Sequence, residues 1–376
     1  KLTGNDQLKH GDRLTAEDML ILSKIFVGNS AIKGLDLRYN NITDKGAVYI
    51  AHLIQESESL QSLDLMCNNI EADGAEVIAK SLHKNISLKT LRMTGNKIGN
   101  NGALQLAAML QVNASLEEID VSDCDLATQS VIAFAIVLKN NRRIRAINIS
   151  RPLLFSLQEE TTVHMAQMLV VNKTLRELHM AKHDMTDTGV ERLCEALKLN
   201  VSLRYLDLRC NRITRDGAKF LSEVLKQNPS LEILDLSSNR IEDDGAVYLS
   251  EAIKLPHSKL KALSVTSNNI GKKGLMSFNE AMKVDSCLTH MYIWGNKLEE
   301  PAFSQLISSG RLLEEHTDVS PYEVDGHVFL AETSHGLHRH YYLTSINGGD
   351  GDSSNSALAL MASDSLSLQI YPDSHS

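Results

Sequence analysis

A segment of eleven residues recurs along this chain at a step of 28 residues. The copies that begin at Ile32, Leu60 and Leu88 read IKGLDLRYNNI, LQSLDLMCNNI and LKTLRMTGNKI, and so share the pattern LxxLxLxxNxL. Seven more copies follow, which makes ten repeats in all; they begin at Leu116, Ile144, Leu175, Leu203, Leu231, Leu260 and Leu288. Such regularity indicates an array in which each repeat packs on its neighbours, rather than two or three separate compact domains.

Each repeat combines a strand pattern with a helix pattern. In Leu35-Asp36-Leu37-Arg38 the leucines alternate with variable residues, which is typical of a short strand. A glycine stands six residues after the Asn position in seven repeats, and we expect helix entry after it. The glycines are Gly46, Gly74, Gly102, Gly189, Gly217, Gly245 and Gly274.

The segment after each glycine has helical spacing of its apolar residues. In the first repeat these are Ala47, Ile50, Ala51 and Ile54. A strand and a helix in every repeat predict an α/β solenoid, a horseshoe with a parallel inner sheet and outer helices. Ten strands would give an inner face about 45 Å long, which suits a protein partner better than a metabolite.

An asparagine ends the strand pattern in seven repeats, where its amide can satisfy backbone groups left unpaired as the chain turns inward. We expect these side chains to stack into a polar ladder. They are Asn40, Asn68, Asn96, Asn211, Asn239, Asn268 and Asn296.

The 28-residue step, the LxxLxLxxNxL strand and the DxGA helix start resemble the ribonuclease-inhibitor type of leucine-rich repeat, over residues 32 to 310. The resemblance implies the fold strongly and the function weakly, since inhibitors, GTPase activators and immune sensors all use such repeats. The N-terminal cap, the ten repeats and the C-terminal segment PYEVDGHVFLAE together resemble one non-enzymatic member of this group. That resemblance implies an intracellular interaction protein of germ, stem or ciliated cells, in cytoplasm and nucleus, the nucleolus or the cilium included.

The ends of the array predict caps. Residues 14 to 30 read as a helix with Thr15 as its N-cap, so residues 1–31 form an N-terminal cap ahead of the repeats at 32–315. Residues 301 to 315 would supply the last helix. Residues 316–346 form a C-terminal cap with a β-hairpin around Asp325-Gly326, either covering the edge of the last strand or docking separately. The remainder, 347–376, is predicted to be a flexible tail.

The ladder is interrupted in the middle, where Cys124, Pro152 and His183 replace Asn. The step between Pro152 and His183 grows from 28 to 31 residues. Three extra residues must bulge there. The apolar segment 151–157 is either a local repacking or a contact loop centred on Phe155.

Composition and charge exclude several classes of protein. A net charge of −9 disfavours a nucleic-acid or anionic-membrane surface, although a basic local patch stays open. Five widely spaced cysteines without a CxxC pair indicate neither a disulfide framework nor a zinc knuckle. The sequence has no run of 18 apolar residues, so no membrane span is expected.

Candidate binding residues lie at strand positions between the leucines. His290, Tyr292 and Trp294 alternate in the last repeat and should share the concave face, unless the C-terminal cap buries them. Tyr205 and Arg209 form a second candidate. An acidic row has two interpretations. Its aspartates either belong to the repeat consensus and orient neighbouring strands, or attract a basic partner, with Arg38, Arg92 and Arg209 locally reducing the negative potential. The row comprises Asp36, Asp64, Asp120, Asp207 and Asp235.

The sequence offers no catalytic machinery and no cofactor site. Phosphate-binding, nucleophile-elbow and zincin motifs are absent, and His335, His338 and His340 lack the partners of a metal motif. N-x-[ST] triplets such as Asn41-Ile42-Thr43 and Asn200-Val201-Ser202 recur at repeat positions and are interpreted as consensus by-products.

The sequence therefore predicts a non-enzymatic scaffold or adaptor. Its concave face and C-terminal aromatic cluster would bind one or more proteins of unknown identity, alone or within a large assembly. Two alternatives stay open: a GTPase activator of the Ran-activating kind, and an enzyme inhibitor like ribonuclease inhibitor. The first would be favoured by an acidic tail, which residues 347–376 do not provide.

Overall fold

The computed structural model describes residues 1–5, 13–154, 159–227, 230–256, 258–284, 287–297, 317–324, 327–332 and 337. It divides into two compact units, residues 1–183 and 184–376. The helix predicted at 301–315 and the tail predicted at 347–376 lie outside the described residues. Within the described ranges, no helix is long and apolar enough to cross a membrane.

The first unit alternates helices with three-residue strands. Its elements are α1 (Ala16–Phe26), β1 (Gly34–Asp36), α2 (Asp44–Glu56), β2 (Ser62–Asp64), α3 (Ala72–Leu82), β3 (Thr90–Arg92), α4 (Gly99–Met109), β4 (Glu118–Asp120), α5 (Thr128–Leu138), β5 (Ala146–Asn148), α6 (Glu160–Val171) and β6 (Glu177–His179).

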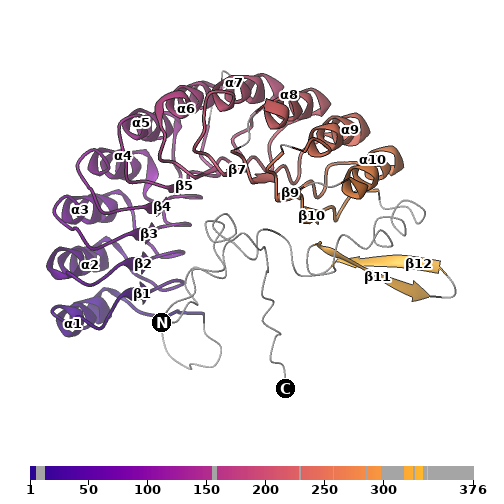
Figure 1. The fold of residues 1–376 in the computed structure, drawn as a ribbon. Coiled ribbons are helices and arrows are strands. Elements are labelled where there is room, and N and C mark those ends of the chain that lie inside the picture. The colour runs from indigo at the N-terminus through magenta and orange to yellow at the C-terminus, as the bar shows by residue number, and fades with distance from the viewer. Residues whose placement is uncertain are drawn as a thin grey trace. The chain divides into compact units, whose positions relative to one another are not determined.

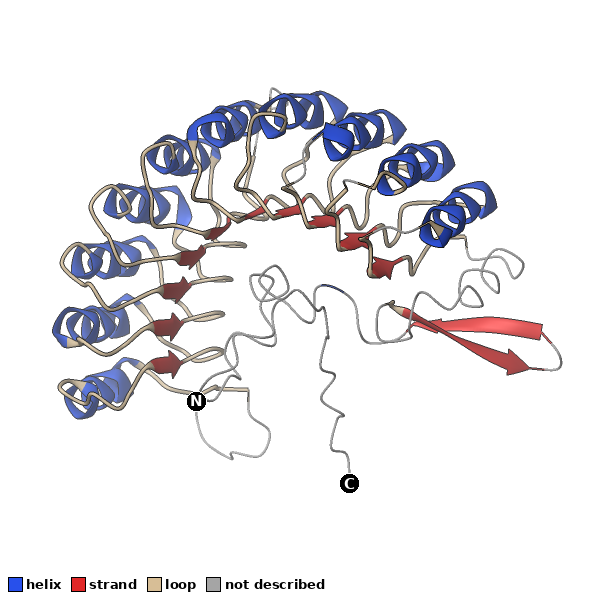
Figure 2. Cartoon of the chain, in the orientation of Figure 1, coloured by secondary structure: helices blue, strands red, loops and turns tan. Residues whose placement is uncertain are grey.

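The strands of this unit pair in parallel, in chain order, and the helices lie on one side of them (Figures 1 and 2). Leu35 pairs with Leu63 and Leu63 with Leu91, so the register equals the sequence step. The helix residues expected to face the strands are buried, Ile50 and Ile78 completely. The predicted leucine-rich-repeat solenoid architecture is therefore confirmed within this unit.

The N-terminal helix is also confirmed. It begins after Thr15, whose backbone N–H and hydroxyl both donate to the Asp18 carboxylate, at 2.8 and 2.9 Å. The backbone N–H groups of Leu2 and Gly4 donate to the carbonyls of Asp36 and Arg38, both at 2.9 Å. The first residues thus satisfy carbonyls along the outer edge of β1, which would otherwise be free to pair.

The second unit repeats the pattern and ends in an antiparallel pair. Its elements are α7 (Asp187–Leu197), β7 (Tyr205–Asp207), α8 (Arg215–Gln227), β8 (Ile233–Asp235), α9 (Glu242–Ile253), β9 (Ala262–Ser264), α10 (Lys272–Lys283), β10 (His290–Tyr292), β11 (Val319–Val324) and β12 (His327–Glu332). The strands β7 to β10 pair in parallel in chain order.

The C-terminal antiparallel pair is confirmed, with Val324 opposite His327. The last strand of the parallel series, β10, is contacted by the residues just before this pair. Thr317 forms a parallel bridge with Met291, and the Asp318 carboxylate accepts the backbone N–H of Ile293 at 2.8 Å. The segment that leads into β11, rather than the tip of a hairpin, therefore covers the edge of β10.

Two details differ from or refine the sequence expectations. Helices begin before the recurring glycine, not after it: α2 starts at Asp44, two residues ahead of Gly46. The three extra residues of the fifth step, from Ile144 to Leu175, lie outside the strands, because Ala146 pairs directly with Glu177. The insertion therefore falls between β5 and α6, where Glu159 takes a left-handed φ of 52° at the helix start.

Candidate functional site

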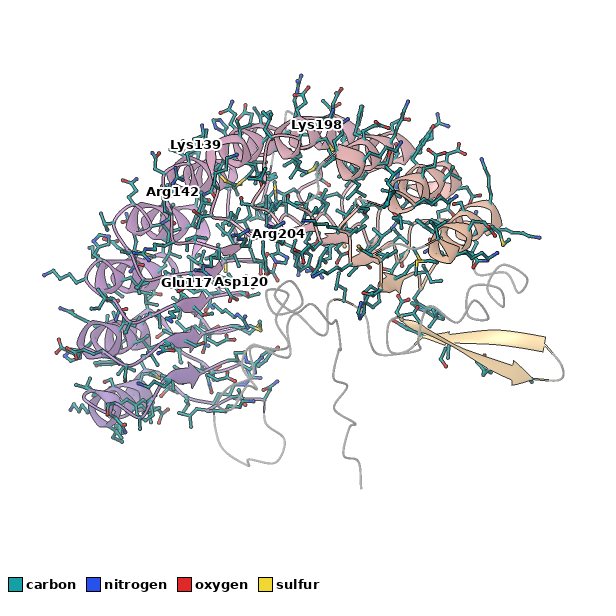
Figure 3. The ribbon with its side chains drawn as sticks, in the orientation of Figure 1. Glu117, Asp120, Lys139, Arg142, Lys198 and Arg204 are labelled. Carbon is teal, nitrogen blue, oxygen red and sulfur yellow. The ribbon has the colours of Figure 1, made fainter. Side chains whose placement is uncertain are left out.

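The candidate surface in each unit is the face of the strands that points away from the helices, here called the strand face. Its acidic row is engaged in local hydrogen bonds. In the first unit, Asp64 accepts the backbone N–H of Met66 at 2.9 Å, and Asp120, labelled in Figure 3, accepts that of Ser122 at 3.0 Å. Asp235 accepts the N–H of Ser237 at 3.0 Å in the second unit. Each carboxylate therefore fixes the residue two places on, which favours the framework interpretation.

Arginines neutralise much of this row. Arg38 donates to both carboxylate oxygens of Asp36, each at 3.0 Å, and Arg209 lies 3.0 Å from Asp207. Their side chains keep only 18% and 15% of their area exposed. Both arginines are thus held in place and offer little free charge to a partner.

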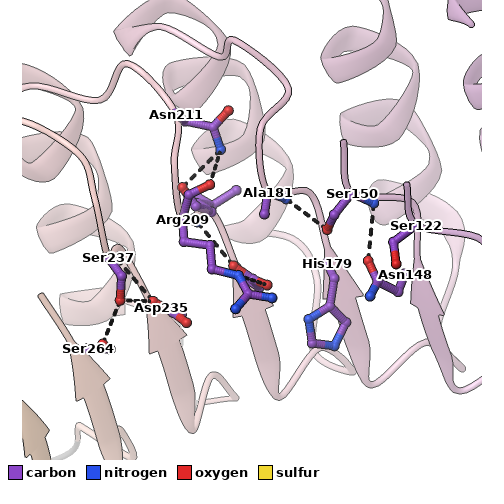
Figure 4. A network of polar contacts seen from close by, with 12 residues as sticks. Ser122, Asn148, Ser150, His179, Ala181, Arg209, Asn211, Asp235, Ser237 and Ser264 are labelled. Atoms are coloured by element: carbon purple, nitrogen blue, oxygen red, sulfur yellow. Dashed lines mark hydrogen bonds and ion pairs between the residues drawn. The ribbon is translucent and has the colours of Figure 1, made fainter. Parts of the chain in front are cut away.

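Burial shifts the titration of two members of the row. It raises the pKa of Asp64 to about 6. The hydrogen bond from the backbone N–H of Met66 and the charge of Arg92 act in the opposite direction and lower this pKa. It also raises the pKa of Asp235 to about 6, helped by the like charge of Asp207. Asn148 occupies the equivalent place in β5 and accepts the N–H of Ser150 at 3.1 Å, so an uncharged side chain can do the same work (Figure 4).

Asp64→Asn is therefore expected to stabilise the chain at pH 7.5 by about 1–2 kcal/mol. Because the pKa of Asp64 is higher in the folded than in the unfolded chain, its contribution is complete below about pH 4 and is lost as pH rises through 6. The gain from the variant should thus shrink between pH 7 and pH 4. Denaturant titrations across this range measure it, with the exposed Glu58→Gln as control; a loss of stability that is the same at every pH would contradict the prediction.

The aromatic candidates of the last repeat divide into buried and accessible residues. His290 and Tyr292 are each 1% exposed, with ring centroids 6.4 Å apart, and burial raises the pKa of Tyr292. Trp294 is half-buried, and its backbone N–H donates to Asp318 at 3.0 Å. Burial in turn raises the pKa of Asp318 to about 6. A partner could reach the Trp294 side chain but not the other two rings.

The remaining candidates are not brought together into one site. Tyr205 is 1% exposed and so belongs to the core rather than to a contact surface. Phe155 lies outside the described residues, although Leu153 just before it is 48% exposed. Sequence alternation put Tyr205 at a strand position between the leucines, but it did not reveal that its side chain is covered.

The predicted asparagine ladder makes one recurring set of contacts. In the first unit, Asn68 donates to the carbonyls of Leu37 and Leu65 at 2.9 and 3.0 Å and accepts the N–H of Ile42 at 3.1 Å. In the second, Asn239 likewise donates to the carbonyls of Leu208 and Leu236. The same contacts, in whole or in part, are made by Asn40, Asn96, Asn211, Asn268 and Asn296.

The interruptions of the ladder keep part of its chemistry. The Cys124 thiol donates to the carbonyl of Met93 at 3.0 Å. The ring of His183 lies 3.0 Å from the carbonyl of Ile149, within hydrogen-bonding distance. These two side chains therefore fill the ladder position with a polar group of different shape.

Sequence reasoning missed a second row of asparagines at the turn from helix to strand. Asn113 donates to the carbonyls of Leu82 and Asn85 at 2.7 and 3.2 Å, and accepts the N–H groups of Ser115 and Leu116 at 3.0 and 2.8 Å. The row comprises Asn85, Asn113, Asn141, Asn172 and Asn200, all buried. Its signal was the recurring N-x-[ST] triplet, which begins at every member of the row except Asn141. Burial makes this triplet a structural motif rather than a glycosylation acceptor.

Across the described ranges, no group of three or more His, Cys, Asp or Glu side chains is placed to hold a metal ion. His335, His338 and His340 lie outside these ranges.

Comparison with known proteins supports the repeat architecture. A family model described as leucine-rich repeat matches residues 28–51, 56–79, 84–107, 112–135, 171–194, 199–222, 227–250 and 257–278. Human leucine-rich repeat-containing protein 34 is 62% identical over 364 residues, covering 96% of this chain and 78% of that protein. The mouse protein of the same name is 54% identical over 344 residues, covering 91% and 83%.

Proposed function

Since the chain belongs to the leucine-rich-repeat family, within the group of leucine-rich repeat-containing protein 34, we propose that it is a non-enzymatic scaffold that binds one or more proteins. The strand faces of its units and Trp294 would supply the contacts. On the family resemblance, we place it in the cytoplasm and nucleus of germ, stem or ciliated cells, in a nucleolar or axonemal assembly.

The exposure of Trp294 carries this proposal. Tryptophan is the residue type most enriched at the energetic centres of protein interfaces, because it buries a large rigid surface on binding. Its backbone N–H is held by Asp318, so little backbone entropy remains to be lost when a partner docks. Arg209 and Arg38, fixed by their carboxylates, would contribute positioned hydrogen-bond donors rather than free charge.

Trp294→Ala is expected to weaken partner binding by about 2 kcal/mol, which is roughly thirtyfold in Kd. Affinity capture from ciliated or germ-line cells, with quantitative mass spectrometry of the recovered proteins, measures the effect. Tyr248→Ala is the matched control, because Tyr248 is a half-buried aromatic residue on α9, the helix side of the same unit. Equal partner recovery with both folded variants would refute the role of Trp294.

A further inference from the structure

A cluster of six cations lies where α5 and α6 turn back into β5 and β6. This cluster, the basic edge, comprises Lys139, Arg142, Arg143, Arg145, Lys173 and Arg176. The two segments that carry it, KNNRRIR at 139–145 and VVNKTLR at 170–176, contain no Asp or Glu. Arg142, Arg143, Arg145 and Lys173 are exposed, and Lys139 and Arg142 lie beside the helices in Figure 3.

The two segments are stacked on each other. The backbone N–H of Arg176 donates to the carbonyl of Arg145 at 2.7 Å, and the Asn172 amide donates to the carbonyl of Asn141 at 3.3 Å. Neighbouring strands are about 4.8 Å apart. Arg145 therefore lies beside Arg176, and Arg142 occupies the place equivalent to Lys173. The charge is therefore concentrated on one small surface.

Two of these cations donate hydrogen bonds to backbone carbonyls. Arg142 donates to the carbonyl of Lys139 at 2.9 Å and Lys173 to that of Val170 at 3.1 Å, both at helix C-termini, which favour cations. Arg145 lies 3.6 Å from Glu117, a pair that is largely exposed and so contributes little.

The fold itself does not require cations here. Arg142 and Arg143 follow Asn141 of the second asparagine row. The equivalent places after Asn85 and Asn113 carry Ile86 with Ser87, and Ala114 with Ser115, all uncharged. The same turn therefore forms without any charge after the asparagine, so Arg142 and Arg143 are features of this repeat. Arg145 and Arg176 occupy a place that is basic in other repeats too, as at Lys89, Arg204 and Lys261.

We infer that the basic edge binds an acidic segment of a partner protein, one that also carries apolar residues. Charge complementarity supplies the acidic part. The apolar part follows from Val170 and Val171, which are 38% and 46% exposed at the margin of the cluster. This surface is independent of Trp294 and extends the proposed function to a second contact.

A nucleic acid fits the basic edge less well. The cluster spans only two repeats, whereas a phosphate backbone gains affinity from a long track of cations, and the chain as a whole carries −9. Neither segment contains an aromatic side chain on which a base could stack.

The test titrates the full chain against a short fluorescein-labelled peptide of glutamates and leucines at low ionic strength. Arg143→Glu combined with Arg145→Glu spares the two cations that bond helix carbonyls, and should weaken binding about tenfold or more. Lys45→Glu with Lys97→Glu makes the same change in net charge at exposed sites elsewhere in the unit, and should change the affinity less than about twofold. Trp294→Ala should leave it unchanged, which separates this inference from the proposed function.

Equal weakening by both double variants, or no binding of the peptide to the wild-type chain, would overturn the inference. So would tighter binding of a short oligouridylate that is lost in the Arg143 and Arg145 variant, since the surface would then be a nucleic-acid site. Thermal unfolding checks that each variant is folded. Should the charge reversal unfold the chain, Arg143→Gln with Arg145→Gln replaces it, with an expected loss of about threefold.

Discussion

Replacing Asn113 by aspartate is expected to lower the free energy of unfolding by about 3–4 kcal/mol at pH 7.5. Asn113 is 5% exposed and uses both ends of its amide on backbone groups of two successive repeats. Aspartate keeps the acceptor but loses the donor, and sets a buried negative charge beside the carbonyl of Leu82, which Nδ2 now approaches to 2.7 Å. Repeats stabilise one another through their contacts, so the damage should reach the neighbouring repeats as well.

Urea titrations followed by circular dichroism measure this loss. Asn41→Asp is the matched control, because Asn41 also opens an N-x-Thr triplet but is exposed, and its change should stay within about 0.5 kcal/mol. The deficit of the Asn113→Asp variant should shrink toward pH 5, since a protonated carboxyl can donate again to the Leu82 carbonyl. Equal stabilities of the two variants would mean that the second asparagine row is dispensable.

The regular part of the fold could be predicted because each repeat meets only its neighbours. A leucine every 28 residues fixes both the strand and its register, so Leu35, Leu63 and Leu91 fall into one row. The same periodicity predicted the buried helix face. Local sequence and nearest-neighbour packing agree in such an array, which is why one aligned pattern was sufficient.

The candidate site was less predictable, because exposure depends on what else packs on a face. Alternation placed His290, Tyr292 and Trp294 together, yet His290 and Tyr292 are buried and Trp294 is half-buried. The pairing of Asp318 with the backbone of β10 could not be read from the repeat, since Asp318 lies beyond it.

The residue with left-handed backbone conformation that precedes each ladder position could not be predicted from the sequence, for another reason. Tyr39, Cys67, Asp123 and Arg151 all adopt a φ between 53° and 60° there, while Gly95 takes 75°. Lys182 and Ser238 do the same in later repeats. Since such different residue types share one backbone conformation, no residue pattern marks it. This conformation costs about 1 kcal/mol or more per non-glycine residue, and the contacts of the surrounding repeat offset that cost.

Gly102→Leu is expected to destabilise the chain by about 3 kcal/mol, and Gly102→Ala by less. Gly102 lies in the first turn of α4, where a Cβ atom would stand 2.9 Å from the Cβ of Ala75 and 3.3 Å from the Cα of Ala72, both on α3. Neither atom can rotate away, so α4 would have to move off α3. Helix propensity alone argues the opposite, since alanine is favoured over glycine by about 1 kcal/mol within a helix.

Close helix packing and helix propensity therefore predict opposite signs for Gly102→Ala. The exposed Asn101→Ala, one residue earlier in α4, tests propensity alone and should be neutral or slightly stabilising. Thermal and urea unfolding of the three variants should give a graded loss from Gly102→Ala to Gly102→Leu, with Asn101→Ala at or above the wild type. If Gly102→Ala were instead as stable as Asn101→Ala, the recurring glycine would serve helix entry, as its sequence position alone suggested, and not the contact between neighbouring helices.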